Sequence, residues 1–335
     1  MRFVKVLLIM AFGSICACGA LFAQGVDLRS WRILVPKSTS SLPLLALGRG
    51  RAEIERDMQI EIPEGLRFEV DFFANHPQAL ALLLRGEVDM ILTGTSQGWE
   101  NHLGGGPIVM VNTGIWGVSS LVGRIPSFSG IEDLRGKRIA LPFPGSPLDF
   151  QMRAILVTAG LDPDRDVELI YAPPVQTAGR LLKGQLDAAP LPEPLASNLV
   201  LRKGLQRLME IKDAWAEISG GDPLSPQVSL FMIRSAEGKR AGSRATPAAV
   251  QTVVGLWRQS SRWITEHPQE AGGIFAPLLD LPPDVLQEAV ENTVYAIPEF
   301  AENQRRVMDY FGRVNRYYSE LGRGESLAPE FFFSP

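Results

Sequence analysis

The chain has 335 residues, of which 45% are hydrophobic, and its 33 basic and 37 acidic residues give a formal net charge of −4. This length suggests two domains, and the hydrophobic content is enough to bury a substantial core. A mildly acidic chain without runs of lysine or arginine lacks the electrostatic footprint of phosphate-backbone binding, so no nucleic-acid partner is predicted.

Residues 1–23 have the pattern of a secretory leader. Arg2 and Lys5 precede an apolar stretch, which is followed by small residues. The stretch is near or below the roughly 20 apolar residues needed to cross a bilayer, so we predict a signal peptide rather than a membrane anchor. We therefore expect an exported, periplasmic protein, whose net charge moves from −4 to −6 when the two basic residues leave with the leader.

Two processing routes for this leader are open. Residues 21–23 suit cleavage by signal peptidase after Ala23. Residues 15–18 instead resemble a bacterial lipobox, which would make the protein a lipoprotein anchored through Cys18. We favour cleavage after Ala23, because residues 20–22 are too apolar for the flexible tether that follows a lipidated cysteine. Both cysteines lie in the leader, so no disulfide, cysteine-ligated metal or cysteine nucleophile is expected in the folded part.

After the leader, the first part of the chain alternates apolar strand patterns with helical ones. The expected strands are residues 31–35, 68–72, 90–92 and 108–112, and the expected helices are 42–55, 78–85 and 93–103. Strands that alternate with helices imply parallel pairing with right-handed crossovers.

A second series begins after residue 113. Its expected strands are 117–122, 138–141, 167–170, 188–191 and 205–211, and its helices are 148–160, 175–183 and 194–202. Residues 228–233 suit a strand that returns to the first part, and residues 246–321 have helical periodicity broken at prolines. We therefore divide the mature chain into lobe one, residues 26–113 and 228–335, and lobe two, residues 117–223. Two chain crossings would form the hinge.

A nine-residue pattern occurs twice. Residues 83–91 (LLRGEVDMI) return 98 positions later as residues 181–189 (LLKGQLDAA). In each copy a leucine-rich helix would end at the glycine, which accepts left-handed backbone, and the aspartate would lead into a short apolar strand. One copy alone would mark only an ordinary helix end and strand start, but two matched copies indicate two related lobes. Such units build the carboxyl edge of an open α/β sheet, where small ligands bind.

Several segments resemble signatures of the type II periplasmic solute-binding proteins of ABC importers. They are residues 133–140 (DLRGKRIA) leading to Pro144-Gly145-Ser146, residues 184–189 (GQLDAA) followed by Glu193-Pro194, and residues 263–271. The match is to the branch that serves nitrate, sulfonates, taurine and thiamine precursors. The resemblance implies an α/β, two-lobed type II periplasmic-binding-protein fold, with two open sheets flanked by helices and joined by a two-strand hinge.

The same resemblance implies the function and the partners. We expect an extracytoplasmic solute-binding protein that closes two lobes on a small polar or heteroaromatic ligand and delivers it to the membrane permease of an ABC importer. The protein is expected to be a monomer. A ligand-binding sensor domain without transport is the alternative, and an enzyme of a vitamin or quinone pathway on the same fold is a more distant one.

Three hydroxyl-lined turns, each between a strand and a helix, are the first candidates for ligand binding. They contain Ser40 and Ser41, Thr95 and Ser96, and Gly145 and Ser146. Unpaired backbone N–H groups and the positive end of the helix dipole would face a cleft there. The alternative for Ser146 is an N-cap that satisfies only its own helix. The first two turns contain no arginine or lysine, and Lys37 is the only cation close to them. This argues against a ligand that is strictly a sulfonate or nitrate.

Three further residues are ligand-binding candidates. Trp116, beside the first crossing, could stack on a flat ring, or else pack in the core. Glu193 could accept a hydrogen bond from an amine-bearing ligand, or stabilise the first turn of the next helix. Gln227, at the return crossing, could be a ligand donor or simply exposed.

No catalytic residue, metal site or cofactor is predicted. Neither His76, His102 nor His267 forms a recognisable pair with a nucleophile, and no His/Asp/Glu cluster has the spacing of metal ligands. The run Gly104-Gly105-Gly106 lacks the following Lys-Ser/Thr of a phosphate-binding loop. We therefore expect a binding protein rather than an enzyme.

Overall fold

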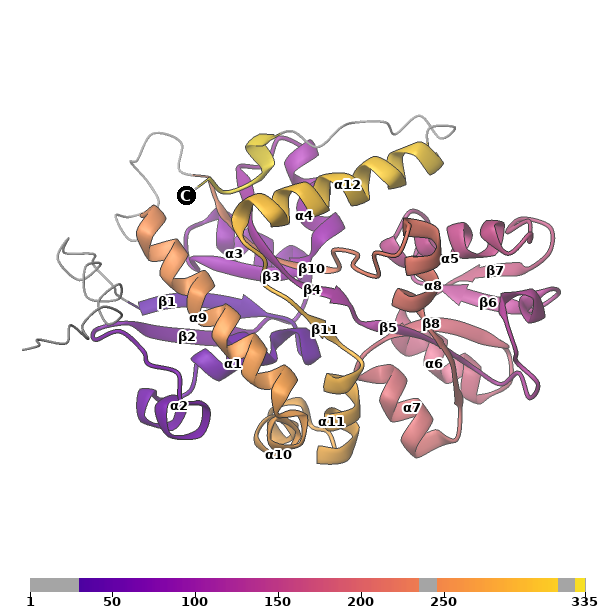
Figure 1. Cartoon of the computed structure of the whole chain (residues 1–335), viewed down its shortest axis with the longest axis horizontal. Coiled ribbons are helices and arrows are strands. Elements are labelled where there is room, and N and C mark those ends of the chain that lie inside the picture. Colours follow the sequence, from indigo (N-terminus) through magenta and orange to yellow (C-terminus); the bar gives the residue numbers. More distant parts are fainter. Residues whose placement is uncertain (1–29, 235–245, 319–328, 335) are drawn as a thin grey trace, which may run out of the picture.

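Two β-sheets, each flanked by helices, form two bodies that lie side by side in the computed structural model of the chain (Figure 1). The structure describes residues 30–234, 246–318 and 329–334. The predicted leader, with Cys18 and Ala23, lies outside the described residues. The fold class expected from the sequence is confirmed.

The first sheet has six strands in the order β11-β4-β10-β3-β1-β2. β1 pairs in parallel with β2 and β3, whereas β10 pairs antiparallel with β3 and β4. The strand bounds are β1 Ser30–Val35, β2 Arg67–Phe72, β3 Met90–Gly94, β4 Ile108–Gly117, β10 Val228–Ile233 and β11 Val294–Tyr295. The helices of this body are α1 Leu42–Leu47, α2 Arg51–Met58, α3 His76–Leu84, α4 Thr95–Leu103, α9 Pro247–Glu266, α10 Pro268–Leu279, α11 Pro283–Glu291 and α12 Phe300–Tyr318.

The second sheet has five strands in the order β7-β6-β8-β5-β9. Here β6 pairs in parallel with β7 and β8, and β5 pairs antiparallel with β8 and β9. The strand bounds are β5 Ser119–Gly123, β6 Arg138–Leu141, β7 Glu168–Tyr171, β8 Ala188–Pro192 and β9 Gln206–Glu210, and the helices are α5 Pro147–Thr158, α6 Pro174–Leu182, α7 Leu195–Lys203 and α8 Ile211–Ser219.

The two copies of the nine-residue pattern lie in different sheets and have the same local geometry. Gly86 and Gly184 end α3 and α6 with φ of 72° and 68°. The following aspartates lead into β3 and β8, and each accepts a hydrogen bond at 2.8 Å from the backbone N–H of an arginine, Arg32 for Asp89 and Arg138 for Asp187. The repeat is thus a structural unit of each body.

The chain passes between the two sheets at Val118 and again between α8 and β10. All described strands of the first sheet come from residues 30–117 and 228–295, and those of the second from residues 119–210. We therefore keep the predicted division, lobe one as residues 26–113 and 228–335 and lobe two as residues 117–223, as a working definition.

Several predicted element boundaries need correction. The helix expected over 42–55 is two helices, because the chain turns at Gly48–Gly50, where Gly48 passes so close to β2 that a Cβ would lie 3.1 Å from Val70. Pro277 does not break a helix but lies inside α10, which continues to Leu279. Helix α8 and the two-residue strand β11 were not predicted.

Candidate ligand-binding site at the lobe junction

The first predicted turn follows β1 as a buried 3-10 turn, Thr39–Ser41. Its hydroxyls have partners within the turn: Ser40 Oγ lies 2.5 Å from Ser38 Oγ, and Ser41 Oγ donates to the carbonyl of Pro36. Thr39 instead contacts a distant segment, with Thr39 Oγ1 3.3 Å from Thr293 Oγ1. Thr39 is therefore the member of this turn that connects to the rest of the candidate site.

The second turn begins α4 at the end of β3. Thr95 is fully buried, and its Oγ1 lies 2.8 Å from Ser229 Oγ, which in turn lies 2.9 Å from Thr113 Oγ1. These contacts join the start of α4 to β10 and β4 through a row of hydroxyls. Ser96, the neighbour of Thr95, is half-buried. The side chain of Thr95 thus has a partner within the sheet.

The third turn precedes α5 and is capped by its own side chains. Ser146 Oγ accepts a hydrogen bond from the backbone N–H of Asp149 at 3.1 Å, as an N-cap does. The backbone N–H of Gly145 donates to Asp149 Oδ2 at 2.7 Å. The carboxylate of Asp149 therefore occupies the anion position at this helix N-terminus.

Trp116 is buried between the lobes rather than exposed to a cleft. Its Nε1 donates to the carbonyl of Ala296 at 2.9 Å, and its ring belongs to an apolar cluster that includes Phe150 and Trp215 of lobe two. Tyr310 of α12 packs on the same rings, with centroids 5.6 Å from Trp215 and 6.1 Å from Phe150. This aromatic joint connects the two lobes along α12, and the geometry favours the packing interpretation of Trp116.

Gln227 lies on the return crossing. Its Nε2 donates to Ser225 Oγ at 2.9 Å, and Gln151 of α5 donates to the same oxygen at 2.8 Å. The backbone carbonyl of Gln227 accepts from the N–H of Thr95 at 3.0 Å. Gln227 therefore links the crossing to the start of α4.

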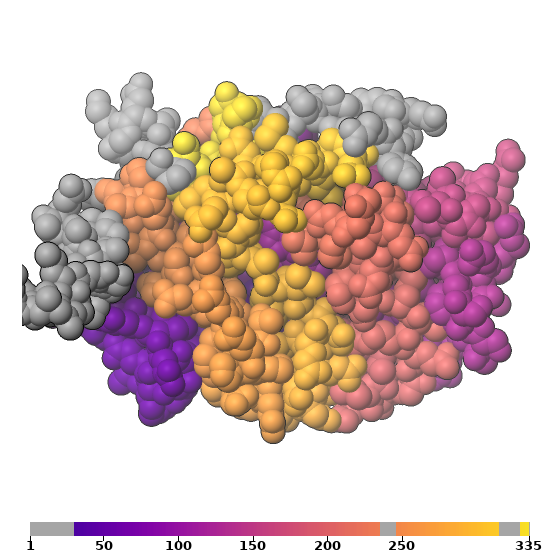
Figure 2. Space-filling view, viewed as in Figure 1, coloured from indigo at the N-terminus to yellow at the C-terminus, as the bar shows by residue number. Residues whose placement is uncertain are grey.

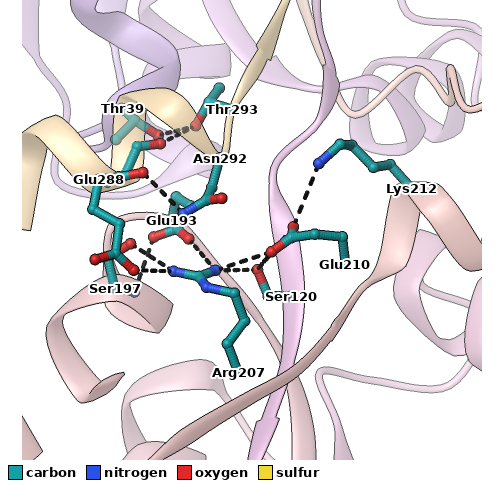
Figure 3. Close-up of polar contacts among 11 residues, drawn as sticks. Thr39, Ser120, Glu193, Ser197, Arg207, Glu210, Lys212, Glu288, Asn292 and Thr293 are labelled. Carbon is teal, nitrogen blue, oxygen red and sulfur yellow. Dashed lines mark hydrogen bonds and ion pairs between the residues drawn. The ribbon is translucent and has the colours of Figure 1, made fainter. Parts of the chain in front are cut away.

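Glu193 is part of a buried ionic cluster around Arg207 (Figure 3). The Arg207 guanidinium donates to Glu193 Oε1 at 2.7 Å and to Glu288 Oε1 at 2.9 Å. The Glu193 side chain has no exposed surface, and its Oε2 accepts from the backbone N–H of Ser197 at 3.0 Å in the first turn of α7. Burial raises the pKa of the Glu193 carboxyl, against the opposing effect of Arg207.

The cluster brings the two lobes together. Arg207 comes from β9 of lobe two, and Glu288 comes from α11 of lobe one. Arg207 also contacts Ser120, Ser197 and Glu210, so its N–H groups are shared among several acceptors. In the space-filling view, α11 and α7 meet at the same boundary (Figure 2).

Tyr295 of β11 completes the junction. Its hydroxyl donates to the carbonyl of Thr39 at 2.9 Å. Burial raises the pKa of the Tyr295 phenol, and the negative charge of Glu193 raises it further. Residues from the ends of β1 and β8 thus converge with β11, and the groups that they offer are carboxylate, phenol and hydroxyl.

The cations near this junction all have carboxylate partners. Lys37 Nζ lies 2.5 Å from Asp280 Oδ2, and Lys212 Nζ lies 3.8 Å from Glu210 Oε2. Arg207 pairs with Glu193, Glu210 and Glu288. The junction therefore offers carboxylate and carbonyl oxygens that can accept hydrogen bonds, whereas its positive charges are already paired.

The predicted site residues thus fall into two groups. Ser40 and Ser41 share a turn with Thr39, and Glu193 lies in the ionic cluster, so these residues are at the junction. The others, Thr95, Ser96, Trp116, Gly145, Ser146 and Gln227, lie on turns and crossings around it, several with side chains already engaged by the protein. Sequence reasoning missed Arg207, Glu288, Thr293 and Tyr295.

Other chemistry has little support in the described part of the chain. Within residues 30–234, 246–318 and 329–334, no group of three His, Cys, Asp or Glu side chains could hold a metal ion. His76 Nδ1 lies 2.6 Å from Thr93 Oγ1, and burial lowers the pKa of this imidazole. Over the same ranges, none of the helices combines the length and apolar character needed to span a membrane.

The architecture is the two-lobed fold of periplasmic solute-binding proteins. Residues 118–217 match the NMT1-like family. A relative from Brucella abortus (strain 2308), provisionally named a binding protein, is 24% identical over 228 residues, which cover 68% of this chain and 67% of the relative. The predicted resemblance is confirmed.

Two solved structures show the same fold. The periplasmic aliphatic sulphonate binding protein SsuA of Escherichia coli has a TM-score of 0.68 at 18% identity, covering 92% of each chain. The ligand-binding component of an ABC-type import system from Staphylococcus aureus, with zinc bound, has a TM-score of 0.68 at 14% identity, covering 92% of this chain and 97% of that one. At these identities the likeness establishes the fold.

Proposed function

We propose that this protein is an extracytoplasmic solute-binding protein, which closes its two lobes on a small polar or heteroaromatic solute and delivers it to the permease of an ABC importer. The observation that carries the proposal is the ionic cluster at the junction, where Arg207 of lobe two meets Glu288 of lobe one beside Glu193. In a two-lobed fold, groups at the carboxyl ends of strands from both lobes surround the bound ligand.

We further propose that the solute is neutral or cationic. Lys37, Arg207 and Lys212 are each paired with a carboxylate, and Asp149 occupies the N-terminus of α5. Burying an anion beside Glu193 would cost free energy because no uncommitted positive charge of the described junction compensates it. A ligand that donates hydrogen bonds to carboxylate and carbonyl oxygens fits this set of groups.

Cellular placement and partners are part of the same proposal. The leader pattern supports export to the periplasm, with cleavage after Ala23 favoured over lipidation at Cys18. The partner would be a membrane permease, and the protein would act as a monomer. Two structures of the same fold support this assignment, one named as the ligand-binding component of an ABC-type import system and the other as a periplasmic sulphonate binding protein.

A thermal-shift panel on residues 24–335 tests the binding function. The panel contains pyrimidine and flavin precursors, amines, sulfonates, nitrate and aromatic acids, and native mass spectrometry of the protein purified from its own cells identifies any retained solute. A neutral or cationic solute that raises the melting temperature in the parent, but not in Glu193→Gln, supports the proposal. A specific response to sulfonates or nitrate alone would overturn the charge argument.

Uptake measurements separate transport from the alternatives. Deleting the gene should abolish uptake of the identified solute if the protein serves an importer. Normal uptake together with a lost transcriptional or chemotactic response would instead indicate a sensor domain. Conversion of the solute by the purified protein would indicate an enzyme.

A further inference from the structure

His76 lies on the edge of the first sheet that faces the lobe junction. Strands β1, β2 and β3 run parallel, so their carboxyl ends share this edge. The turn after β1 contacts β11 through the carbonyl of Thr39, and the turn after β3 contacts the return crossing, where the N–H of Thr95 donates to the carbonyl of Gln227 at 3.0 Å. His76 follows β2 and therefore shares the edge with both turns.

The start of α3 holds the imidazole of His76 beside the end of β3. Asn75 is the N-cap, and its Oδ1 accepts from the N–H of Gln78 at 2.9 Å, so the helix begins at His76. The Nδ1 of His76 lies 2.6 Å from Thr93 Oγ1, and the ring of Phe73 packs on the imidazole with centroids 5.0 Å apart. The imidazole is thus fixed by a hydroxyl and by an aromatic ring.

The hydrogen bonds of Thr93 determine which nitrogen of this imidazole carries the proton. Gln97 Oε1 accepts from the backbone N–H of Gly94 at 3.2 Å and from the Thr93 hydroxyl at 3.0 Å. Because the single proton of that hydroxyl is donated to Gln97, the contact between Thr93 and His76 needs Nδ1 as its donor. Gly94 makes room for this network, since a Cβ there would lie 2.8 Å from Gln97 Oε1. The proton is therefore on Nδ1, and Nε2 of the neutral ring is an acceptor.

Two side-chain nitrogens at the ends of this network are open to solvent. Burial lowers the pKa of the His76 imidazole, which keeps the ring neutral at neutral pH and leaves a lone pair on its Nε2. Gln97 uses its amide oxygen within the network, so its Nε2 carries two N–H donors. Among the described residues neither Nε2 has a hydrogen-bond partner, and both side chains are half-buried, with neither nitrogen cut off from solvent. An uncharged acceptor and an uncharged donor thus lie on the same edge of the sheet.

We propose that His76 and Gln97 form a solute-binding subsite for a group in which an N–H donor lies beside a nitrogen or oxygen acceptor. Primary amides and amino-substituted heteroaromatic rings contain such a group. The N–H of the solute would donate to Nε2 of His76, and the acceptor of the solute would receive an N–H of Gln97. This inference rests on the proposed solute-binding function and narrows the class of solute.

The same two nitrogens discriminate against anions that lack a donor. A sulfonate or nitrate has only acceptor oxygens, and it would place a lone pair against Nε2 of a neutral imidazole. The other two histidines are not in such a network. His102 Nδ1 lies 3.4 Å from the carbonyl of Ile108, and His267 Nδ1 lies 3.0 Å from the carbonyl of Trp263, each near the end of a helix.

Nitrogen NMR of residues 24–335 with labelled histidine tests the proton assignment before any solute is added. The chain has three histidines, so replacing each in turn assigns the signals. We expect a protonated Nδ1 and a bare Nε2 at His76. A proton on Nε2 of this residue in the neutral ring would overturn the proposal.

Binding of two matched pyrimidines tests the subsite itself. One carries an amino group between its two ring nitrogens, which places an N–H donor beside an acceptor, and the other carries a methyl group at that position. Calorimetry should show that the parent protein binds the aminopyrimidine about tenfold or more tightly than the methyl analogue, which cannot donate to Nε2 of His76. Equal affinities, or no binding of either pyrimidine, would overturn the proposal.

Three variants assign the preference to the two side chains. His76→Asn removes Nε2 but keeps a donor near Thr93, so it should abolish the preference for the aminopyrimidine. Gln97→Glu keeps an oxygen for Thr93 and Gly94 but removes the amide donors, and should weaken aminopyrimidine binding about tenfold. His102→Asn, in the last turn of the same helix, is the control and should leave both affinities unchanged. A preference that persists in folded His76→Asn would overturn the proposal.

The thermal-shift panel keeps this test distinct from that of the proposed function. A panel solute that raises the melting temperature of the parent and of His76→Asn equally would show that the protein binds a solute without this subsite. If no panel solute binds, and native mass spectrometry finds none retained, the proposed function and the subsite fail together.

Discussion

Asp187 accepts a hydrogen bond from the backbone N–H of Arg138 at 2.8 Å, and the guanidinium of the same arginine donates to its carboxylate at 3.0 Å. Asp89 makes the matching backbone contact with Arg32, but the Arg32 side chain extends to the carbonyl of Gly86 at 3.4 Å. The two lobes therefore share a joint between helix and strand, and lobe two strengthens it with an ion pair.

This difference predicts unequal effects of the same substitution. Asparagine keeps an oxygen that can accept the backbone hydrogen bond but removes the charge. Asp187→Asn should lower the free energy of unfolding by about 1 kcal/mol, because it weakens a charge-assisted contact that is partly screened by water. Asp89→Asn, its control in lobe one, should have a smaller effect. Urea unfolding curves would contradict this if the two midpoints moved equally.

Arg207 should be far more important for stability than Arg202, although both contact α11 from lobe two. Arg207→Ala leaves Glu193 buried without its main partner, and breaking a buried pair in this way costs about 3–5 kcal/mol. Arg202 pairs with Asp284 at the surface, where ion pairs contribute little. Denaturant unfolding compares them, and similar losses from both variants would show that the cluster is not the structural centre of the junction.

The pH dependence of stability should carry a contribution from Glu193. Because its folded pKa is raised above 4.5, the folded state binds the proton more tightly than the unfolded state. The contribution of the protonated Glu193 carboxyl to the free energy of unfolding is therefore lost as pH rises from about 4.5 through the folded pKa. Glu193→Gln removes that loss, so its stability relative to the parent should improve with rising pH. A difference that stays constant over this range would contradict the assignment.

Glu288 should control how often the lobes separate. Glu288→Gln weakens its contact with Arg207 without removing volume, and a loss of about 1 kcal/mol corresponds to about a fivefold larger open fraction. Distances between spin labels on the two lobes would measure the shift. Glu291→Gln, on the exposed side of the same helix, is the control and should leave the distances unchanged.

Trp116→Phe distinguishes packing from ligand stacking. Phenylalanine keeps an aromatic ring but loses the hydrogen bond to Ala296, so the free energy of unfolding should fall by about 1–2 kcal/mol. Solute affinity, measured by calorimetry at a temperature where both proteins are folded, should change by less than about twofold. A large loss of affinity with unchanged stability would restore the ligand-stacking interpretation.

Most of the fold could be predicted because its signals are local. Apolar runs gave the strands, and Gly86 and Gly184 marked two helix ends. Helix α8 was missed although Ile211, Trp215 and Ser219 have helical spacing, because the preceding strand was extended over its start. Pro277 sits within α10, two residues before its end, and so removes its own backbone hydrogen bond without ending the helix at that point.

The candidate site was less accessible to sequence reasoning. Hydroxyl-rich turns are visible in a short window, so the Ser40 turn could be proposed, and Glu193 could be proposed because it stands between two prolines after an expected strand. The contact between Arg207 and Glu288 joins residues 81 positions apart, and neither lies in a recognisable motif. For Ser146 two roles were open, and only the position of its Oγ relative to the N–H of Asp149 distinguishes them.

The aromatic joint formed by Tyr310, Phe150 and Trp215 has a consequence for access to the interior. Rings buried on one flank resist separation, because parting them would wet apolar surface, whereas water readily replaces the exposed pair of Arg202 and Asp284 on the opposite flank. We therefore expect the two lobes to rotate apart about α12, and the solute to enter between them from the flank of α7 and α11.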